Sequence, residues 1–348
     1  MKNVSAIDLF CGAGGLTSGF IKSGIKVTAG YDIESSCQYA YETNNNNVIF
    51  IHKDVTNVAA NELIAQYPTS DIKLLAGCAP CQPFSTYSHG RDAKQHNKWP
   101  LLYQFSRLIR EVKPELVTME NVPDVIKHEV YHDFVEELKA QNYHVWAEKV
   151  YCPDYGIPQM RSRHVLLASK LGPIKILAKT HASTKYNSVR QTIGNLPLLN
   201  SGEQHKSDPL HRSAQLSDLN LRRIRASKQG GTWRDWPSEL VADCHRRKSG
   251  KTYSGVYARM SWDKPSPTMT TQCFGFGSGR FGHPDQDRAI SLREAALLQT
   301  FPNTYKFIPH DEPLQMTVVG RMIGNAVPPR LGEVIGETFL QHLKEQYE

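Results

Sequence analysis

Two cysteines lie three positions apart in the segment Gly77–Ser85, which directly follows a short apolar run. A C-x-x-C pair is typical of redox or zinc chemistry. A structural zinc site needs four ligands, and because the sequence holds no second C-x-x-C we expect no metal site. A dithiol pair formed by Cys78 and Cys81 remains one interpretation. The other is that Cys81 alone is a nucleophile at a strand end, where backbone donors stabilise its thiolate.

A carboxylate and two arginines could act together with such a nucleophile. Glu120 ends the next apolar run, so it should lie at the same sheet edge as Cys81, and a thiol beside a carboxyl suits attack coupled to protonation. Arg161 and Arg163 stand at positions i and i+2, which point to one face of a strand. Their planar forks can hold a carboxylate, a base carbonyl or a phosphate. Taken singly, a cap, a surface acid or a charged edge strand explains these residues as well.

A glycine-rich turn, DLFCGAGG, follows the first apolar run at residues 8–15. Glycines let the backbone turn tightly against a cofactor at a helix N-terminus, although an ordinary strand–helix turn is an equal alternative. Asp32 and Glu34 close the next run, where an acid can hold ribose hydroxyls. The spacing G-x-G-G departs from G-x-G-x-x-G, which weighs against a nicotinamide enzyme. Asp54 follows the third run and could accept a bond from an adenine amine or cap the next helix.

Apolar runs alternate with amphipathic stretches over the first 170 residues, and these elements must position the groups above. The expected strands are Val4–Phe10, Val27–Asp32, Val48–His52, Leu74–Gly77, Leu116–Glu120, Val145–Tyr151 and His164–Ala168. The expected helices are Leu16–Ser23, Ser35–Asn44, Asn61–Tyr67, Leu101–Val112 and Val130–Gln141. This alternation predicts an α/β fold with a doubly wound, mainly parallel sheet. Ligands in such folds bind at the carboxyl ends of the strands.

The alternation breaks near residue 178. Residues 178–275 are rich in polar, basic, glycine, proline and tryptophan positions without a clear period, which predicts a second, smaller and irregular domain. Helical patterns return at Ser291–Gln299 and Arg330–Leu343. We therefore expect a first domain over residues 1–177, a second over 178–275, and a C-terminal segment, 276–348, that packs back on the first.

The positive charge of the chain is concentrated in one segment. The 348 residues carry a net charge of +7, and residues 180–260 alone hold 14 lysines and arginines against 6 acidic residues. This segment is either a solvated basic surface or a polyanion-binding module, because phosphate contacts need clustered Lys and Arg. The scattered cysteines, the lack of a signal-peptide core and the lack of a long apolar run predict a cytoplasmic protein without a membrane partner.

Six short motifs occur in an order that resembles the DNA cytosine-5 methyltransferase family of bacterial type. They extend from residue 8 to residue 329 and read DLFCGAGG, PCQPFS, ENV, QMRSR, REAALLQTFP and GNAVPP. Each is weak alone, but six in order leave little room for chance. The resemblance implies a Rossmann-like methyltransferase that uses S-adenosylmethionine to methylate carbon 5 of a flipped-out cytosine, in a specific double-stranded DNA sequence, through a covalent adduct.

The resemblance also implies the catalytic roles. Cys81 matches the family's nucleophile, and Glu120 matches the acid that bonds to ring nitrogen 3 and the amino group of cytosine. Arg163, supported by Arg161, matches the arginine pair that contacts the base and its backbone. Cys78 occupies a position often filled by glycine, so we expect it to be a bystander.

A cofactor pocket within the first domain is implied in the same way. Phe10 and Ile33 would flank the adenine, and Asp32, which stands where many members carry glutamate, would bind the ribose. Asp54 would bind the adenine amine, and Asn325 would reach the methionine end. The implied pocket residues are Phe10, Gly12, Gly14, Asp32, Ile33, Asp54, Val55, Pro80, Leu102 and Asn325.

Contacts with double-stranded DNA are implied for two parts of the chain. Ser85 begins a polar loop, Ser85–Trp99, that we expect to close over the flipped base, and Thr270 matches a threonine that contacts the DNA backbone. The domain 178–275 would recognise the target, and its candidate DNA-binding residues are Arg222, Arg223, Arg225, Arg246 and Arg247.

We expect a monomer in the nucleoid, with any cognate restriction endonuclease acting separately. Methylation of transfer RNA, an inactive binding module and a C-x-x-C oxidoreductase are the alternatives.

Overall fold

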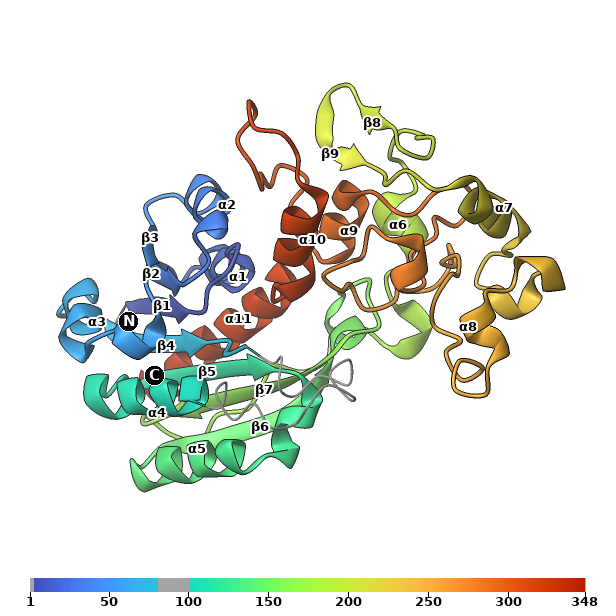
Figure 1. The fold of residues 1–348 in the computed structure, drawn as a ribbon. Helices are drawn as coiled ribbons and strands as arrows, with labels where there is room; N and C mark the ends of the chain where they lie inside the picture. The colour runs from blue at the N-terminus through green and yellow to red at the C-terminus, as the bar shows by residue number, and fades with distance from the viewer. Residues whose placement is uncertain (1–2, 81–99, 348) are drawn as a thin grey trace. The chain divides into compact units, whose positions relative to one another are not determined.

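The computed structural model describes residues 3–80 and 100–347 (Figure 1). The chain divides into two compact units. The first comprises Met1–Tyr155, Ser162–Thr180 and Val327–Glu348, and the second comprises Gly156–Arg161 and His181–Ala326. The segment 276–326 therefore groups with the second unit, whereas the C-terminal helix groups with the first. No helix in the described ranges is long and apolar enough to cross a membrane.

A seven-stranded sheet forms the centre of the first unit, in the order β3-β2-β1-β4-β5-β7-β6. The strands are β1 (Val4–Leu9), β2 (Lys26–Asp32), β3 (Ile49–His52), β4 (Ile72–Gly77), β5 (Leu116–Asn121), β6 (His144–Tyr151) and β7 (Ser162–Ser169). Strands β1 to β5 pair in parallel, and β7 pairs antiparallel with both β5 and β6. The predicted mainly parallel, doubly wound sheet is confirmed.

The central strands lie between helices on both faces, and their burial shows this. Every residue of β1 and of β5 is buried. Strands that are covered on both faces appear in a sequence as continuous apolar runs, which is why pattern alone located them. From β1 the strands β2 and β3 extend the sheet to one side, and β4 and the later strands extend it to the other, so the strand order reverses between β1 and β4. Such a switch point is where doubly wound folds bind ligands.

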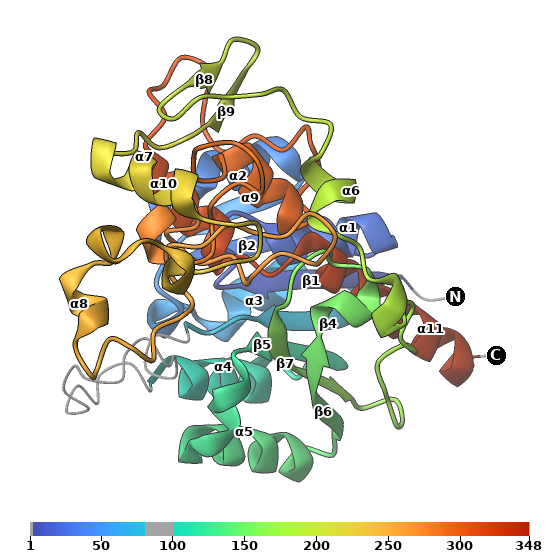
Figure 2. The same ribbon diagram turned by 90° about the vertical axis from the view of Figure 1, so that its right-hand side faces the viewer.

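The α-helices described in the first unit are α1 (Gly15–Ser23), α2 (Gln38–Asn44), α3 (Ala60–Gln66), α4 (Pro100–Val112), α5 (Glu129–Ala140) and α11 (Pro329–Tyr347). Helices α4 and α5 lie side by side in Figures 1 and 2, with the rings of Phe105 and Phe134 stacked at a centroid distance of 5.5 Å. Helix α1 packs closely on α11 because glycines, which have no side chain, lie where the two helices meet. A Cβ on Gly19 would collide with the backbone of Pro329, and a Cβ on Gly332 would collide with the backbone of Leu16.

The second unit has little regular structure, as its sequence predicts. Its elements are α6 (Val189–Ile193), β8 (Gln204–His205), β9 (Asp208–Arg212), α7 (Asp218–Ala226), α8 (Asp243–Arg246), α9 (Leu292–Leu298) and α10 (Met316–Asn325). Of these, only α9 was predicted. A small apolar cluster that includes Ile224, Trp233, Trp236 and Phe276 stabilises the part between α7 and α8.

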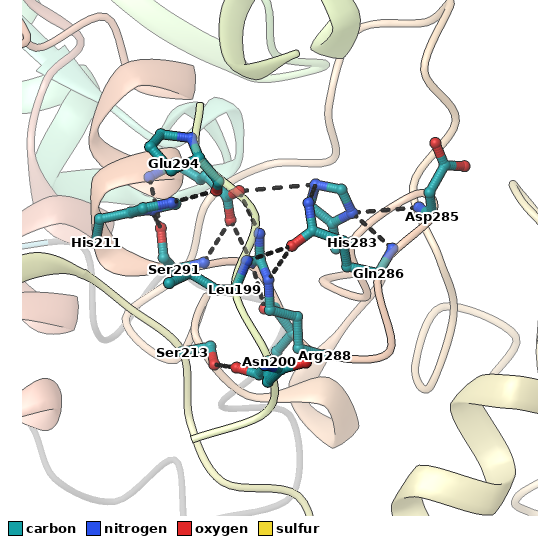
Figure 3. A network of polar contacts seen from close by, with 12 residues as sticks. Leu199, Asn200, His211, Ser213, His283, Asp285, Gln286, Arg288, Ser291 and Glu294 are labelled. Atoms are coloured by element: carbon teal, nitrogen blue, oxygen red, sulfur yellow. Dashed lines mark hydrogen bonds and ion pairs between the residues drawn. The ribbon is translucent and has the colours of Figure 1, made fainter. Parts of the chain in front are cut away.

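A buried polar network stabilises the start of α9 (Figure 3). Arg288 and Glu294 form a bidentate ion pair at 2.7 and 2.8 Å, and both side chains are almost fully buried. Burial alone would raise the pKa of Glu294, but hydrogen bonds and charge from Arg288 outweigh burial, so this pKa lies below its usual value. His211 bonds to Ser291, the N-cap of α9, at 2.8 Å. The network therefore connects three distant segments of the unit.

Candidate active site

The register of the sheet brings the predicted chemical groups to one edge. Leu9 pairs with Gly77 across β1 and β4, and Gly77 pairs with Met119 across β4 and β5. The next residues along these three strands are Phe10, Cys78 and Glu120, so they lie next to one another at the carboxyl edge. The start of the glycine-rich turn, the first cysteine of the C-x-x-C segment and the acid thus lie at one edge of the sheet, as expected from the sequence.

The glycine-rich turn has the geometry of a cradle. Phe10, Gly12 and Gly14 all have positive φ, at 58°, 50° and 85°, a region that non-glycine residues rarely adopt. Phe10 therefore holds a strained conformation, which folded proteins retain mainly at functional positions. A Cβ placed on Gly12 would meet no atom within 4 Å, so open space lies against this turn. The turn therefore fits a nucleotide-like group, because at Gly12 no side chain separates the backbone from a ligand.

Asp32 fixes this turn to the end of β2. Its Oδ2 accepts a hydrogen bond from the Gly12 N–H, and its Oδ1 accepts one from the Glu34 N–H, both at 2.8 Å. Burial raises the pKa of Asp32, although these backbone donors oppose the shift. Each carboxylate oxygen retains a lone pair for a further donor, such as a ribose hydroxyl.

The other implied pocket residues of the first unit differ in exposure. The side chain of Ile33 is 65% exposed, which is unusual for isoleucine and leaves it available to a ligand. Asp54 caps the 3₁₀ turn Val55–Asn57, with its Oδ1 accepting from the Thr56 N–H at 2.8 Å, so the capping interpretation is confirmed. Val55 and Leu102 are buried in the core of the unit.

Glu120 forms an ion pair with Arg163 at the edge of the site. Arg163 Nε lies 2.7 Å from Glu120 Oε1, and both side chains are largely buried. The Nε–H is not aligned for a hydrogen bond, so Oε1 is a buried oxygen without a hydrogen-bond donor among the described residues. A buried acceptor of this kind requires a partner, and a bound base can supply one. The geometry thus supports an acid and an arginine that act on the same ligand.

The chain segment that leads to Cys81 is anchored from β5. Asn121 is buried, and its side-chain amide donates to the Ala79 carbonyl at 3.0 Å. This bond fixes the backbone one residue before the exposed Pro80. Cys81, Ser85 and the expected closing loop Ser85–Trp99 lie outside the described residues. Asn121 was not singled out in the sequence, where it reads only as the middle letter of ENV.

The two arginines of QMRSR do not share a strand face. Strand β7 begins at Ser162, so Arg161 precedes it, and the prediction that both arginines point the same way from one strand is wrong. Arg161 belongs to the second unit and is buried. It donates to the carbonyls of Met269 at 3.0 Å and Ala326 at 3.2 Å. Arg163, by contrast, lies on β7 in the first unit, and a two-residue pattern does not reveal that the boundary between the units falls between the arginines.

Thr270 and Asn325 are neighbours within the second unit. The backbone of Thr270 packs against Gly324, where any Cβ would collide with it. Arg161 bonds to Met269 on one side of this contact and to Ala326 on the other. The buried guanidinium of Arg161 therefore helps to place both Thr270, which is implied to contact the DNA backbone, and Asn325, which is implied to contact the cofactor.

Asp8 is a buried charged group that was not singled out as a site residue. It lies on β1 and is fully buried; its Oδ2 accepts from the Thr17 hydroxyl at 2.7 Å, while its Oδ1 has no hydrogen-bond partner in the described structure. Burial, together with the charge of Asp32, raises the pKa of Asp8 to about 7. A lone aspartate within an otherwise apolar strand was the available signal.

We expect Asp8→Asn to stabilise the ligand-free protein at pH 8 and not at pH 4. The unfolded chain releases the Asp8 proton near pH 4, whereas the folded chain retains it to about pH 7, so stability is lost as pH rises through that window. Removing the carboxylate should recover at most about 4 kcal/mol at pH 8. Urea unfolding at both pH values measures this, and an equal effect at both would contradict it.

Most predicted DNA-binding arginines already have protein partners. Arg223 donates to the Leu240 carbonyl and lies over the rings of Trp236 and Tyr257. Arg225 forms an exposed ion pair with Asp287 at 3.1 Å. The remaining three are Arg246, which donates to backbone carbonyls, and Arg222 and Arg247, which are exposed and have no side-chain partner in the described structure.

The fold and this site together are those of an α/β protein in which a glycine-rich turn lies at the same sheet edge as an acid–arginine pair. A profile of the family described as C-5 cytosine-specific DNA methylase matches residues 4–341. The chain therefore belongs to the C-5 cytosine-specific DNA methylase family and is a DNA cytosine-5 methyltransferase. A protein named Type II methylase M.HgiDII, from Herpetosiphon aurantiacus, is 52% identical over 99% of this chain and 97% of its own length.

A further relative and two solved structures are also similar to the chain, and the structures show the fold alone. Type II methyltransferase M1.HphI of Haemophilus parahaemolyticus is 30% identical over 97% of this chain and 87% of its own. A solved DNA modification methyltransferase encoded within an E. coli prophage superposes with a TM-score of 0.75 at 21% identity, covering 98% of this chain and all of its own. The Dnmt2 methyltransferase of S. pombe superposes at 0.65 with 15% identity, covering both chains fully, and shows the fold alone.

Proposed function

We propose that the chain transfers the methyl group of S-adenosylmethionine to carbon 5 of a cytosine that is flipped out of a specific double-stranded DNA sequence, with Cys81 as a covalent nucleophile. One observation carries this proposal. The buried pair of Glu120 and Arg163 lies at the strand edge from which Asn121 anchors the segment that leads to Cys81. This arrangement supports a site in which an acid, a fixed cation and the Cys81 thiolate act on one ligand.

The cofactor pocket follows from the cradle at the carboxyl edge. Phe10, Gly12 and Gly14 would lie against the cofactor, and Asp32 would bind its ribose between the two backbone donors that already hold it. Ile33 would cover one face of the adenine with its exposed side chain. When bound, S-adenosylmethionine supplies an electrophilic methyl group. Asn325, from the second unit, remains a proposed contact to its methionine end.

The chemistry requires the residues to act in sequence. Carbon 5 of cytosine is a poor nucleophile, and attack of the Cys81 thiolate on carbon 6 converts the ring into an enamine that pushes electrons to carbon 5. Glu120 would share a proton with ring nitrogen 3 and so stabilise the charge that develops there. Arg163 would hold both Glu120 and the base in place. After methylation, loss of the carbon 5 proton allows the thiol to leave by elimination.

The purified chain tests this proposal directly. Incubation with labelled S-adenosylmethionine should label double-stranded DNA and leave transfer RNA unlabelled. DNA that carries 5-fluorocytosine at the target should trap a covalent complex, because fluorine at carbon 5 blocks the elimination step. Labelling of transfer RNA alone would contradict the DNA assignment. Labelled DNA without a trapped complex would instead contradict the covalent step.

We also infer that the chain acts as a monomer in the cytoplasm and that any partner endonuclease is a separate protein.

We expect residues 178–275 to determine which sequence is methylated. This segment carries most of the excess positive charge, and phosphate and base contacts need such side chains. Exchanging the segment for the matching one of a relative with a different target should transfer the target preference. Sequencing of bisulfite-treated plasmid from cells that express the chimera measures the outcome. An active chimera that keeps its original target would show that the specificity lies elsewhere.

A further inference from the structure

We propose that one exposed loop of the second unit enters a groove of the duplex, and that Arg247 at its tip reads the target sequence. The loop comprises residues 243–255, and we name it the α8 loop because it begins with helix α8. Within its unit it stands out around the α8 label in Figures 1 and 2. The inference rests on the proposed function, since it names the residues that would recognise the DNA substrate.

The α8 loop has a rigid aromatic base. The ring of His245 stacks on Trp233 at a centroid distance of 4.4 Å and an interplanar angle of 9°. The indole N–H of Trp233 donates to the Tyr253 carbonyl at 2.6 Å, so one tryptophan fixes both ends of the loop. Tyr257 meets His245 edge-on from the other side. Trp233 and His245 are buried, which shows that these contacts are structural.

Backbone bonds close the tip of the loop. The N–H groups of Gly250 and Lys251 both donate to the Arg247 carbonyl, at 3.0 and 3.1 Å. The Arg234 guanidinium donates to the Lys251 carbonyl at 2.7 Å. A Cβ on Gly250 would collide with the Cys244 carbonyl, so only glycine allows this tight return. A loop that is already ordered binds without the entropic penalty of ordering it, which favours a role in recognition.

The arginines of residues 180–260 differ in whether they bond to other groups of the protein. Six of the nine arginines in residues 180–260 bond to carbonyls or carboxylates of the protein, namely Arg190, Arg223, Arg225, Arg234, Arg246 and Arg259. Arg222 and Arg247 are exposed, and no hydrogen bond or ion pair of their side chains occurs in the described structure. A guanidinium without a protein partner keeps its full fork for a guanine edge or a phosphate.

The surroundings of Arg247 distinguish it from Arg222. Lys248 and Lys251 lie exposed on the same tip, and Tyr253 beside them is 66% exposed. The only acidic residue of the loop is Asp243, at its start. A cationic tip that also carries an exposed aromatic ring matches a groove lined by phosphates with bases at its floor. Arg222 lies on helix α7, where its cationic neighbours Arg223 and Arg225 already bond to protein groups, and this helix contains no aromatic residue.

The test compares Arg247→Ala with Arg222→Ala. Each substitution removes one exposed guanidinium that has no described protein partner, so both variants should fold with unchanged thermal stability. Each purified variant methylates a DNA library with randomised positions, and bisulfite sequencing reads which sequences are modified. We expect Arg247→Ala to lose about 10- to 100-fold in rate on the preferred sequence and to accept alternatives at one base pair.

Arg222→Ala should keep the preference of the unmodified chain. If Arg222 contacts a phosphate, the dependence of log affinity on log salt should become shallower by about one unit. A preference retained by Arg247→Ala would overturn the proposal, because the α8 loop would then supply charge alone. Absence of DNA methylation by the unmodified chain would overturn the proposed function and, with it, the reading role of the loop.

Discussion

Replacement of Cys81 by alanine is expected to abolish methyl transfer to DNA. Without a thiolate to attack carbon 6, carbon 5 of cytosine does not become nucleophilic. Activity should fall by at least about 10,000-fold, since covalent activation is a requirement and not an aid. The measurement is transfer of labelled methyl groups under single-turnover conditions. The covalent complex with 5-fluorocytosine DNA should vanish as well.

Cys78→Ser is the matched control for this prediction. Cys78 lies at the carboxyl edge of the sheet, and burial and the negative charges of Glu120 and Asp8 raise its pKa well above the ordinary value. A thiol that does not ionise is a poor nucleophile. The serine variant should therefore keep most of its activity and still form the covalent complex. Substantial turnover by Cys81→Ala, or loss of activity only in Cys78→Ser, would refute the single-nucleophile mechanism.

Substitution of Glu120 by glutamine is expected to cost roughly 100- to 10,000-fold in the rate of methyl transfer. The amide keeps the size of the side chain and can still donate to ring nitrogen 3, but it cannot share a proton with it. The ion pair with Arg163 is lost at the same time. Rapid-quench measurement of one turnover with saturating cofactor isolates this step.

Two further measurements make the Glu120 prediction specific. Cofactor affinity should be unchanged, because the cradle of Phe10, Gly12 and Asp32 does not include Glu120. Thermal unfolding shows whether Arg163, left without its partner, destabilises the fold. A folded Glu120→Gln variant with wild-type single-turnover rate would exclude Glu120 from the chemistry and would leave Arg163 as the group that holds the base.

The sequence by itself determined the sheet and the position of its functional edge. Each of the seven strands was predicted to within two residues at either end. Strands buried on both faces are continuous apolar runs, and β1 and β5 are of this kind. Because parallel strands end at a common edge, residues that follow such runs had to meet, and Phe10, Cys78 and Glu120 do.

Helix α10 shows what local pattern could not reveal. Its residues Met316–Asn325 include Gly320 and Gly324, which weaken a helical prediction. In the structure both glycines admit another chain segment, since Phe274 and Thr270 occupy the space where a Cβ would lie. Tertiary packing compensates the low helix propensity of these two glycines, and the residues they pack against, Phe274 and Thr270, lie far away in the sequence.

Only the tertiary structure decided what each cation does. The sequence supplied a count of basic residues and a pair of arginines two apart, but a guanidinium on a long side chain reaches groups that are remote along the chain. Arg161 bonds to carbonyls more than a hundred residues away, and Arg259 bonds to the carbonyls of Ile224 and His283. Such partners follow from how segments pack in space, whereas strand positions follow from local burial. For that reason the sequence located the strand edge where the candidate site residues meet, while the structure separated the arginines that bond to protein groups from those without a protein partner among the described residues.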